Sequence, residues 1–301
     1  MRDKASRTAA DVVALRALSS IAPRKNRIMH DDLALRMLPR PWSWSEQLFS
    51  RPWLKPFTYY LGRAISNTLT GYRGTTELVA LRYRHIDDRL KAAYDSGVRQ
   101  VLLLGAGYDY RSHRTEYGDV RFIEVDHPKT QEGKLRLLDK HQNKTNGRVK
   151  YVSVDFHDDW AAQIEKADVL KPEPTFIIWE GVSYYLKEEA VHYTLGTLKK
   201  LFSPGSILIF DCVPAAHRNG YDPSKELMLT AKYVAKKGEP LLWGGCVENV
   251  RELLEKYDYR EDDISFLSDI AKRLRDNEDV RVQHEPIYDE FYLVETTIPE
   301  A

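Results

Sequence analysis

The chain has 301 residues, of which 43% are hydrophobic, so it is long enough to bury one large core or two modest ones. Lys and Arg total 45, and Asp and Glu also total 45, which gives a formal net charge of zero. This balance argues against attraction of the whole protein to nucleic acid or to an anionic membrane, although it is compatible with a local basic patch.

Cysteine content and segment hydropathy further limit the class of protein and its cellular setting. The two cysteines, Cys212 and Cys246, lie far apart and have no companions at the spacing of a metal site. We therefore expect neither a metal centre nor a disulfide, and a reducing, cytoplasmic setting. The first twenty residues carry charges throughout, unlike a signal peptide, and no apolar run reaches the roughly 18 residues that a membrane span needs.

Residues 1–75 are predicted to form a helical, aromatic-rich cap rather than the start of a sheet. Helices are expected at Thr8–Leu18 and at Asp31–Leu38, where two aspartates favour a helix N-terminus. An aromatic-rich stretch follows between Pro41 and Tyr60. Core packing, the lining of a hydrophobic pocket and contact with a lipid surface are the three roles open to it, and packing is the commonest.

From Gly74 to Tyr94 the apolar residues recur with helical periodicity, which predicts a helix. The apolar run Val101–Leu104 then predicts a strand buried on both faces of a parallel sheet. Gly105 and Gly107 follow it directly. Because glycine permits positive φ and has no Cβ, a nucleotide-like ligand can lie against the backbone N–H groups at this edge of the sheet.

Carboxylates end the next strands. The strand Val120–Asp126 ends in an acid about 20 residues after the glycines, which is the spacing of a ribose-binding carboxylate. A third strand, Val149–Val154, precedes acidic residues that either contact an adenine or cap a helix. The fourth strand, Thr175–Trp179, leads into Glu180. Burying that carboxylate without a partner would cost several kcal/mol, so we expect a cation or donor to face it.

The rest of the chain completes an α/β pattern. A helix around 191–202 leads to a fifth strand, Ser206–Phe210, and the last strand is expected at Glu290–Glu295. Residues 212–245 break the alternation and are predicted to form a lid insertion above the carboxyl edge of the sheet. We therefore predict a doubly wound, mostly parallel seven-stranded, Rossmann-like sheet in a single domain over 76–301.

Five motifs carry a resemblance to a known family. GAGYDYR, FIEVDHP, VDFHDDW, IIWEGVSYYL and PGSILIFD, in this order, resemble motifs of the leucine carboxyl methyltransferase family of class I S-adenosylmethionine (SAM)-dependent methyltransferases, in its bacterial branch. The resemblance implies SAM as cofactor and these contacts: Gly105 and Gly107 under its methionine part, Asp126 at the ribose, Asp158 and Asp159 at the adenine, Glu180 at the amino group, Arg82 at the carboxylate, and Arg16 as a further basic residue. Tyr110 and His157 depart from the family pattern.

The same residues make chemical sense for SAM. The cofactor needs an anion for its ammonium, a cation for its carboxylate and an acid for its ribose diol, and Glu180, Arg82 and Asp126 are of those types. We expect in-line methyl transfer to a carboxylate of a small hydrophobic acid, which is ionised at neutral pH and needs no general base. No catalytic residue is assigned. A hydroxyl acceptor would need a base, for which the candidates are Tyr184, His85 and His113.

Three alternatives stay open at this point. One is a methyltransferase for a protein's C-terminal carboxylate. Another is a nicotinamide-dependent oxidoreductase, although Tyr110 occupies the third glycine position of its Gly-x-Gly-x-x-Gly fingerprint. The last is a non-catalytic module that binds SAM. The expected partner is a small-molecule or carboxylate substrate, with no nucleic acid and no membrane span.

Overall fold

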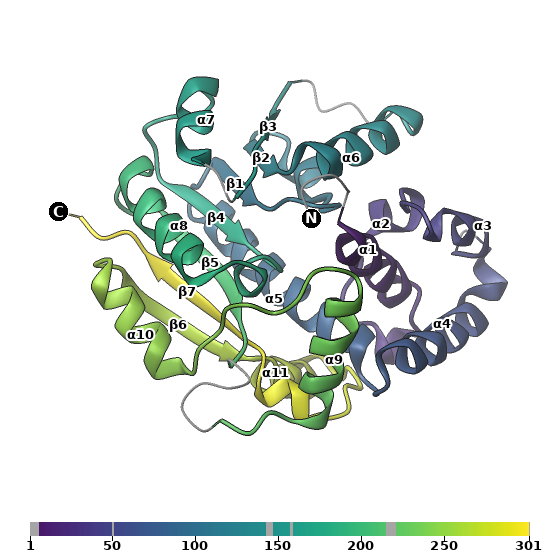
Figure 1. Ribbon diagram of the computed structural model, residues 1–301. Helices are drawn as coiled ribbons and strands as arrows, with labels where there is room; N and C mark the ends of the chain where they lie inside the picture. Colours follow the sequence, from purple (N-terminus) through teal and green to yellow (C-terminus); the bar gives the residue numbers. More distant parts are fainter. Residues whose placement is uncertain (1–5, 50, 143–146, 157–158, 215–220, 301) are drawn as a thin grey trace.

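A single mixed sheet, with helices on both faces, forms the centre of the molecule (Figure 1). The computed structural model describes residues 6–49, 51–142, 147–156, 159–214 and 221–300. The strands are β1 (Gln100–Leu104), β2 (Arg121–Asp126), β3 (Val149–Ser153), β4 (Thr175–Trp179), β5 (Ile207–Cys212), β6 (Arg260–Phe266) and β7 (Tyr292–Thr297). The helices are α1 (Arg7–Ser20), α2 (Asp32–Arg36), α3 (Glu46–Phe49), α4 (Lys55–Thr70), α5 (Thr75–Asp95), α6 (Pro128–Lys140), α7 (Trp160–Ala167), α8 (Glu188–Leu201), α9 (Lys225–Lys236), α10 (Val247–Lys256) and α11 (Leu267–Glu278).

The strand order is β3-β2-β1-β4-β5-β7-β6. The first five strands in this order are mutually parallel, and β7 runs antiparallel to both β5 and β6. The predicted seven-stranded, mostly parallel α/β sheet is confirmed. Since β1, β2 and β4 are parallel neighbours or near neighbours, their carboxyl ends meet at one edge, where the residues that follow them come together.

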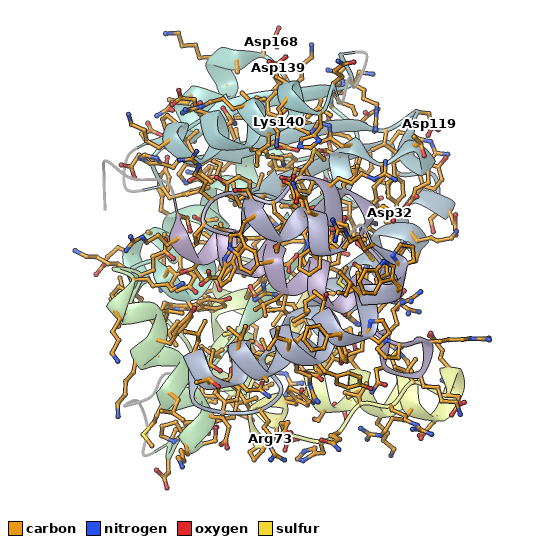
Figure 2. The ribbon with its side chains drawn as sticks, turned by 90° about the vertical axis from the view of Figure 1, so that its right-hand side faces the viewer. Asp32, Arg73, Asp119, Asp139, Lys140 and Asp168 are labelled. Carbon is orange, nitrogen blue, oxygen red and sulfur yellow. The ribbon has the colours of Figure 1, made fainter. Side chains whose placement is uncertain are left out.

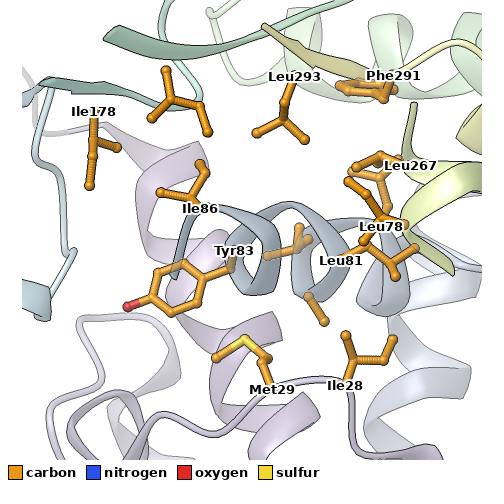
Figure 3. Close-up of a cluster of buried hydrophobic side chains, with 14 of the residues drawn as sticks. Ile28, Met29, Leu78, Leu81, Tyr83, Ile86, Ile178, Leu267, Phe291 and Leu293 are labelled. Atoms are coloured by element: carbon orange, nitrogen blue, oxygen red, sulfur yellow. The ribbon is translucent and has the colours of Figure 1, made fainter. Parts of the chain in front are cut away.

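Alternating side chains of the strands face two separate cores. On one face, residues such as Leu103 and Ile178 pack against α5 and α11. On the other, Leu102 and Ile177 pack against α7, α8 and α10. Figure 3 shows α5 between the sheet, represented by Ile178 and Leu293, and the N-terminal segment with Ile28 and Met29. The long helix α5 is buried on two sides, which fixes its polar side chains rigidly.

The predicted cap and insertion both contain helices of their own. α1 to α4 lie within the predicted range 1–75, and they share a hydrophobic cluster with Tyr108, Tyr110 and Leu138 of the sheet domain. α9 lies within the predicted insertion, 212–245. The division of the chain into a cap and a sheet domain stays a prediction.

Two expectations about the C-terminal strands differ from the structure. The last strand, expected at Glu290–Glu295, runs over Tyr292–Thr297 because residues 286–289 form a 3-10 turn that delays it. The sequence predicted seven strands but located six, and the strand that it did not locate is β6. Its first residues, Arg260 to Asp263, are exposed and charged, so the strand lacks the apolar alternation by which strands are recognised.

Two features of the described residues bear on the class of site. Among the described residues, no helix is both long and apolar enough to cross a bilayer. Within the same part of the chain, no three His, Cys, Asp or Glu side chains are grouped so that they could hold a metal ion.

Candidate functional site

The loop after β1 is built from Gly105, Ala106 and Gly107. Both glycines have positive φ, 78° and 50°, a region that L-residues rarely adopt. The backbone N–H groups of Gly105 and Ala106 donate to the carbonyl of Val125 at 2.8 and 3.0 Å. A Cβ on Gly105 would lie 2.3 Å from Cγ2 of Val182, so the loop packs directly against the turn after β4.

Asp126 ends β2 beside this loop. Its carboxylate accepts hydrogen bonds from the backbone N–H groups of Gly107 and His127, the latter at 2.5 Å. Burial raises the pKa of Asp126 above its usual value, although these two donors and Lys134 act in the opposite direction. The residue is only half-buried, so a ligand that lies on the glycine loop can reach the carboxylate.

Glu180 follows β4 and is held by two arginines. Its Oε1 accepts a hydrogen bond from Nε of Arg82 at 2.9 Å, and its Oε2 accepts one from Nη1 of Arg111 at 2.8 Å. Burial raises the pKa of this carboxyl, but Arg111 and Arg82 outweigh burial and hold the pKa below its usual range. Two cations therefore face Glu180, where the sequence led us to expect a cation or donor. The side chain is an anion at neutral pH.

Arg82, on α5, joins three segments of the chain. Its Nη1 donates to Oδ2 of Asp211 at 2.8 Å and to the hydroxyl of Tyr184 at 2.9 Å. Asp211, at the end of β5, also accepts from the backbone N–H of Gly181 at 2.8 Å. The remaining nitrogen of Arg82, Nη2, makes no hydrogen bond to a described residue. Arg82 is 4% exposed, and its contact with the carboxylate of a cofactor stays a prediction.

Arg111 is a site residue that the sequence analysis misses. It is fully buried, and its Nε donates to Asp87 at 2.6 Å while its Nη1 donates to Asp109 and Glu180. Its guanidinium lies 3.6 Å from the centroid of the Tyr83 ring. The signal was present, because Arg111 is the last residue of the GAGYDYR motif. An arginine is rarely assigned to a core, and this hid its role.

Arg16 reaches the glycine loop from the N-terminal cap. This buried residue of α1 donates through Nη2 to Asp31 at 2.5 Å and through Nη1 to the carbonyl of Tyr108 at 3.2 Å. It also lies 4.3 Å from the centroid of the Tyr83 ring, so one tyrosine contacts both Arg16 and Arg111. The structure brings Arg16 beside the residue that follows Gly107, and its contact with a cofactor stays a prediction.

Of the two predicted adenine contacts, the structure describes Asp159. Asp158 lies outside the described residues. Asp159 caps α7, where its Oδ1 accepts from the backbone N–H of Ala162 at 3.3 Å and also from the hydroxyl of Tyr193. The bond from Tyr193, followed by that from Ala162, lowers the pKa of Asp159. The helix-capping alternative that the sequence left open thus describes Asp159 in this structure, and its adenine role stays a prediction.

Of the three candidate bases, only Tyr184 bonds to Arg82, the arginine that also holds Glu180. Burial raises the pKa of its hydroxyl well above the usual value. His85 is buried beside Arg273, with 3.3 Å between its Nδ1 and the guanidinium, and burial lowers its pKa to about 4. His113 is buried with its Nε2 3.0 Å from the hydroxyl of Tyr151. The structure does not bring either histidine to Glu180.

One more buried carboxylate, Glu239, lies in the segment after α9. It is 6% exposed, and its Oε2 has no hydrogen-bond partner among the described residues. The segment packs on the turn after β4, since the N–H of Leu242 donates to the carbonyl of Tyr184 at 2.7 Å. Burial and the nearby Glu239 both raise the pKa of Tyr185. No sequence signal other than Gly238 and Pro240 on either side marks this residue.

Comparison with known proteins places these residues in a family. The family model for leucine carboxyl methyltransferase matches residues 9–199, a stretch that contains Arg16, Arg82, the glycine loop, Asp126 and Glu180. This is the family that the sequence motifs predicted.

The similar curated proteins cover only part of the chain. A protein from Parafrankia sp. is 33% identical over 172 residues, which are 56% of this chain and 53% of the relative. A protein from Mycolicibacterium smegmatis is 38% identical over 134 residues, 44% of this chain and 45% of the relative. Both carry the provisional name of SAM-dependent methyltransferase. The chain thus spans about half the length of the curated relatives that it matches.

Two solved structures share the fold over most of the chain. A DUF574 family protein from Streptomyces avermitilis has a TM-score of 0.58 at 15% identity and covers 95% of this chain and 97% of its own. A protein from Thermobifida fusca, provisionally assigned as a methyltransferase, has a TM-score of 0.57 at 17% identity and covers 79% and 88%. Such low identities show the fold alone, and the class I methyltransferase fold that the motifs implied is confirmed.

Proposed function

The chain belongs to the leucine carboxyl methyltransferase family, and on this premise we propose that it is a SAM-dependent O-methyltransferase. Its acceptor in this proposal is a carboxylate of a small hydrophobic acid. The observation that carries the proposal is Glu180, a half-buried and ionised carboxylate that follows β4, next to the glycine loop and flanked by two arginines.

The residues at the carboxyl edge of the sheet fit the charges of SAM. The half-buried Asp126 would accept hydrogen bonds from the ribose diol, and Glu180 would face the ammonium group. The Nη2 of Arg82, which has no bond to a described residue, would face the carboxylate. Gly105 and Gly107 have no Cβ, so the methionine part would lie directly against the backbone of this loop, whose N–H groups are already bonded to Val125 and Asp126. An anion, a cation and a diol acceptor thus lie around one loop.

Methyl transfer to a carboxylate requires little from the protein beyond alignment of the two reactants. SAM, when bound, supplies a methyl group on a positively charged sulfur. A carboxylic acid in water has a pKa of about 4 and is ionised at neutral pH, so no side chain has to remove a proton from such an acceptor. The chain's task is to hold the acceptor oxygen in line and to exclude water, and such positioning supplies roughly 7–11 kcal/mol of a barrier.

Labelled cofactor tests the proposal directly. The protein is incubated with methyl-deuterated SAM and a panel of hydrophobic carboxylic acids, and products are analysed by mass spectrometry for methyl esters. The panel includes acids with and without an amino or hydroxyl group, so that a preference for acceptors that carry a hydrogen-bond donor is detected. Label found on nitrogen or carbon and never on oxygen contradicts the proposal.

Binding experiments separate the remaining alternatives. Stabilisation by SAM or S-adenosylhomocysteine, and not by NAD(P), excludes an oxidoreductase. Glu180→Gln keeps the shape of the side chain and removes its charge, so it should weaken S-adenosylhomocysteine binding at least tenfold in calorimetry. Glu165→Gln, on the exposed part of α7, is the matched control. Unchanged cellular or biochemical function of the Glu180→Gln variant would favour a non-catalytic module, and methyl esters on a protein C-terminus would favour the protein substrate.

A further inference from the structure

Helix α4 presents an apolar surface to solvent. All eight of its exposed residues are uncharged, and most are hydrophobic: Pro56, Phe57, Tyr60, Leu61, Ala64, Ile65, Thr68 and Leu69. The four buried ones are Thr58, Tyr59, Ser66 and Thr70. A surface helix normally turns its apolar side inward and its charges outward, whereas α4 exposes most of its large apolar residues and keeps Lys55 and Arg63 half-buried. A face of this kind needs a partner.

Neighbouring residues extend the apolar face. Trp53, just before α4, is 75% exposed, Phe57 is 65% exposed and Tyr60 is 56% exposed. Seven of the eleven large exposed hydrophobic residues in the described chain lie between positions 44 and 69. Concentration of such residues on one segment marks an interaction surface, whereas scattered single ones do not.

The apolar face continues into a cavity between α1 and α4. The cavity has a volume of about 130 Å³, and its walls include Leu15 and Leu18 of α1 and Trp42 and Phe49 of the intervening segment. The N-terminal cap is therefore apolar both in this cavity and on its exposed face.

The segment that carries this face is rich in basic residues. Between residues 33 and 76 the chain has one acidic residue, Glu46, and these six basic ones: Arg36, Arg40, Arg51, Lys55, Arg63 and Arg73. The bordering acids Asp31 and Glu77 are buried in ion pairs with arginines, and the exposed Asp32 lies beside His30. Figure 2 views the molecule from the side of α4 and shows Arg73 at the lower edge of this face. In a chain without net charge, residues 33–76 thus carry six basic residues against one acidic residue.

We propose that the α4 face, made of Trp53 and the exposed residues of α4, docks on a membrane surface that contains anionic phospholipids. The helix spans about 24 Å, with Arg51 and Lys55 at its start and Arg73 just past its end, so it can lie flat with cations at both ends. Aromatic residues such as Trp53 and Tyr60 are suited to the interfacial layer. A second copy of this chain fits less well, because a symmetric dimer would bring two positively charged rims together.

Sedimentation with vesicles tests the proposal. The full chain is mixed with large unilamellar vesicles of phosphatidylcholine alone, or of phosphatidylcholine and phosphatidylglycerol. We expect binding to the anionic vesicles only, weakened by added salt. Phe57→Ser should lower this binding at least tenfold, whereas Leu135→Ser on α6, also an exposed hydrophobic residue, should leave it unchanged.

A second pair of variants tests the charges. Arg51→Gln and Arg73→Gln should each weaken binding about fivefold. Lys150→Gln on β3 and Lys272→Gln on α11 remove the same charge from exposed positions elsewhere and should have no effect. All four positions are exposed, and an unchanged thermal midpoint confirms that each variant is folded.

Three results would overturn the proposal. The first is absence of binding to either vesicle. The second is equal, salt-independent binding to both, which would remove the role of the basic residues. The third is a doubled molecular mass in solution that Phe57→Ser returns to that of a monomer, without vesicle binding. That result would assign the α4 face to a second copy. None of these measurements depends on methyltransferase activity.

Discussion

At the scale of residues, the site is a set of mutually neutralising buried charges arranged around Tyr83. Arg16 and Arg111 contact its ring at 4.3 and 3.6 Å, and each arginine is bonded to its own carboxylates. Buried charges are tolerable only in such pairs, since each lone ion would cost several kcal/mol. Glu180 is part of this set, so its anionic state follows from its neighbours.

Removal of Arg111 should therefore be unusually costly. Arg111→Met leaves Asp109, Glu180 and Asp87 short of a cation, and we expect a loss of about 3–5 kcal/mol in urea unfolding. The matched control is Arg148→Met, because Arg148 is half-buried and, among the described residues, donates only to backbone carbonyls. Equal losses for the two variants would show that the carboxylates do not depend on Arg111.

His85 should make the protein sensitive to mild acid. Burial, followed by Arg273 and Arg89, lowers its pKa to about 4, against 6.5 as the usual value, while Asp263 acts in the opposite direction. The unfolded chain therefore binds this proton more tightly, so its contribution is complete above pH 6.5 and is lost as the pH falls toward 4. Between pH 7 and 5 we expect a loss of about 2 kcal/mol from this residue.

A pair of variants isolates the contribution of His85. Chemical unfolding at pH 7 and pH 5 should show a smaller pH dependence in His85→Gln than in the parent chain. His141→Gln, at an exposed position, should leave the pH dependence intact. If both variants keep the parental slope, the acid sensitivity has another source.

At the scale of elements, the site depends on how the loop after β1 packs on the turn after β4. Gly105→Ala combines a positive φ with a Cβ only 2.3 Å from Val182. Gly97→Ala is the matched control, because Gly97 has a φ of 103° and open space around its Cβ position. The control should cost about 1–2 kcal/mol from backbone strain, and Gly105→Ala should cost about 1–3 kcal/mol more from overpacking.

A double variant checks the cause of that difference. Adding Val182→Ala to Gly105→Ala removes the clash and should recover most of the additional loss in thermal or urea unfolding. Failure to recover it would mean that the two segments do not press on each other.

Sequence patterns predicted elements well where one rule governed them. The run Val101–Leu104 predicted β1 because a short apolar segment before glycines has few other uses. β6 escaped prediction because exposed, charged residues can form an edge strand through backbone pairing with β7 alone. For α4 the spacing of its apolar residues indicates a shared face. Only tertiary packing decides whether that face points inward, and here it points outward.

The site shows the same limit. Asp126 and Glu180 were predictable because each ends a strand whose carboxyl edge position follows from topology. The partners of Glu180 were only half predictable. Arg82 was assigned to the carboxylate of SAM and also contacts Glu180, while Arg111 comes from a different element, and no local pattern shows that the two meet.

At the scale of the whole molecule, Asp11 is one of the residues that join the N-terminal cap to the insertion after β5. Asp11, on α1, accepts hydrogen bonds from the indole of Trp42 at 3.0 Å and from the hydroxyl of Tyr233 at 2.9 Å, and it forms an ion pair with Lys237. Tyr233 lies on α9 and Lys237 directly follows it. The cap and the insertion are thereby in direct contact, so their motions should be coupled.

Loss of this connection should loosen α9 without unfolding the sheet. We expect Asp11→Ala to raise the rate of trypsin cleavage at the lysines of α9 by about 5- to 30-fold, as a 1–2 kcal/mol decrease in the free energy of local opening implies. Asp95→Ala, which removes an exposed ion pair with Lys91 on α5, should leave cleavage of α9 unchanged. Cleavage sites are identified by mass spectrometry. If Asp11→Ala instead accelerates cleavage evenly along the chain, Asp11 stabilises the molecule as a whole and does not specifically join the cap to α9.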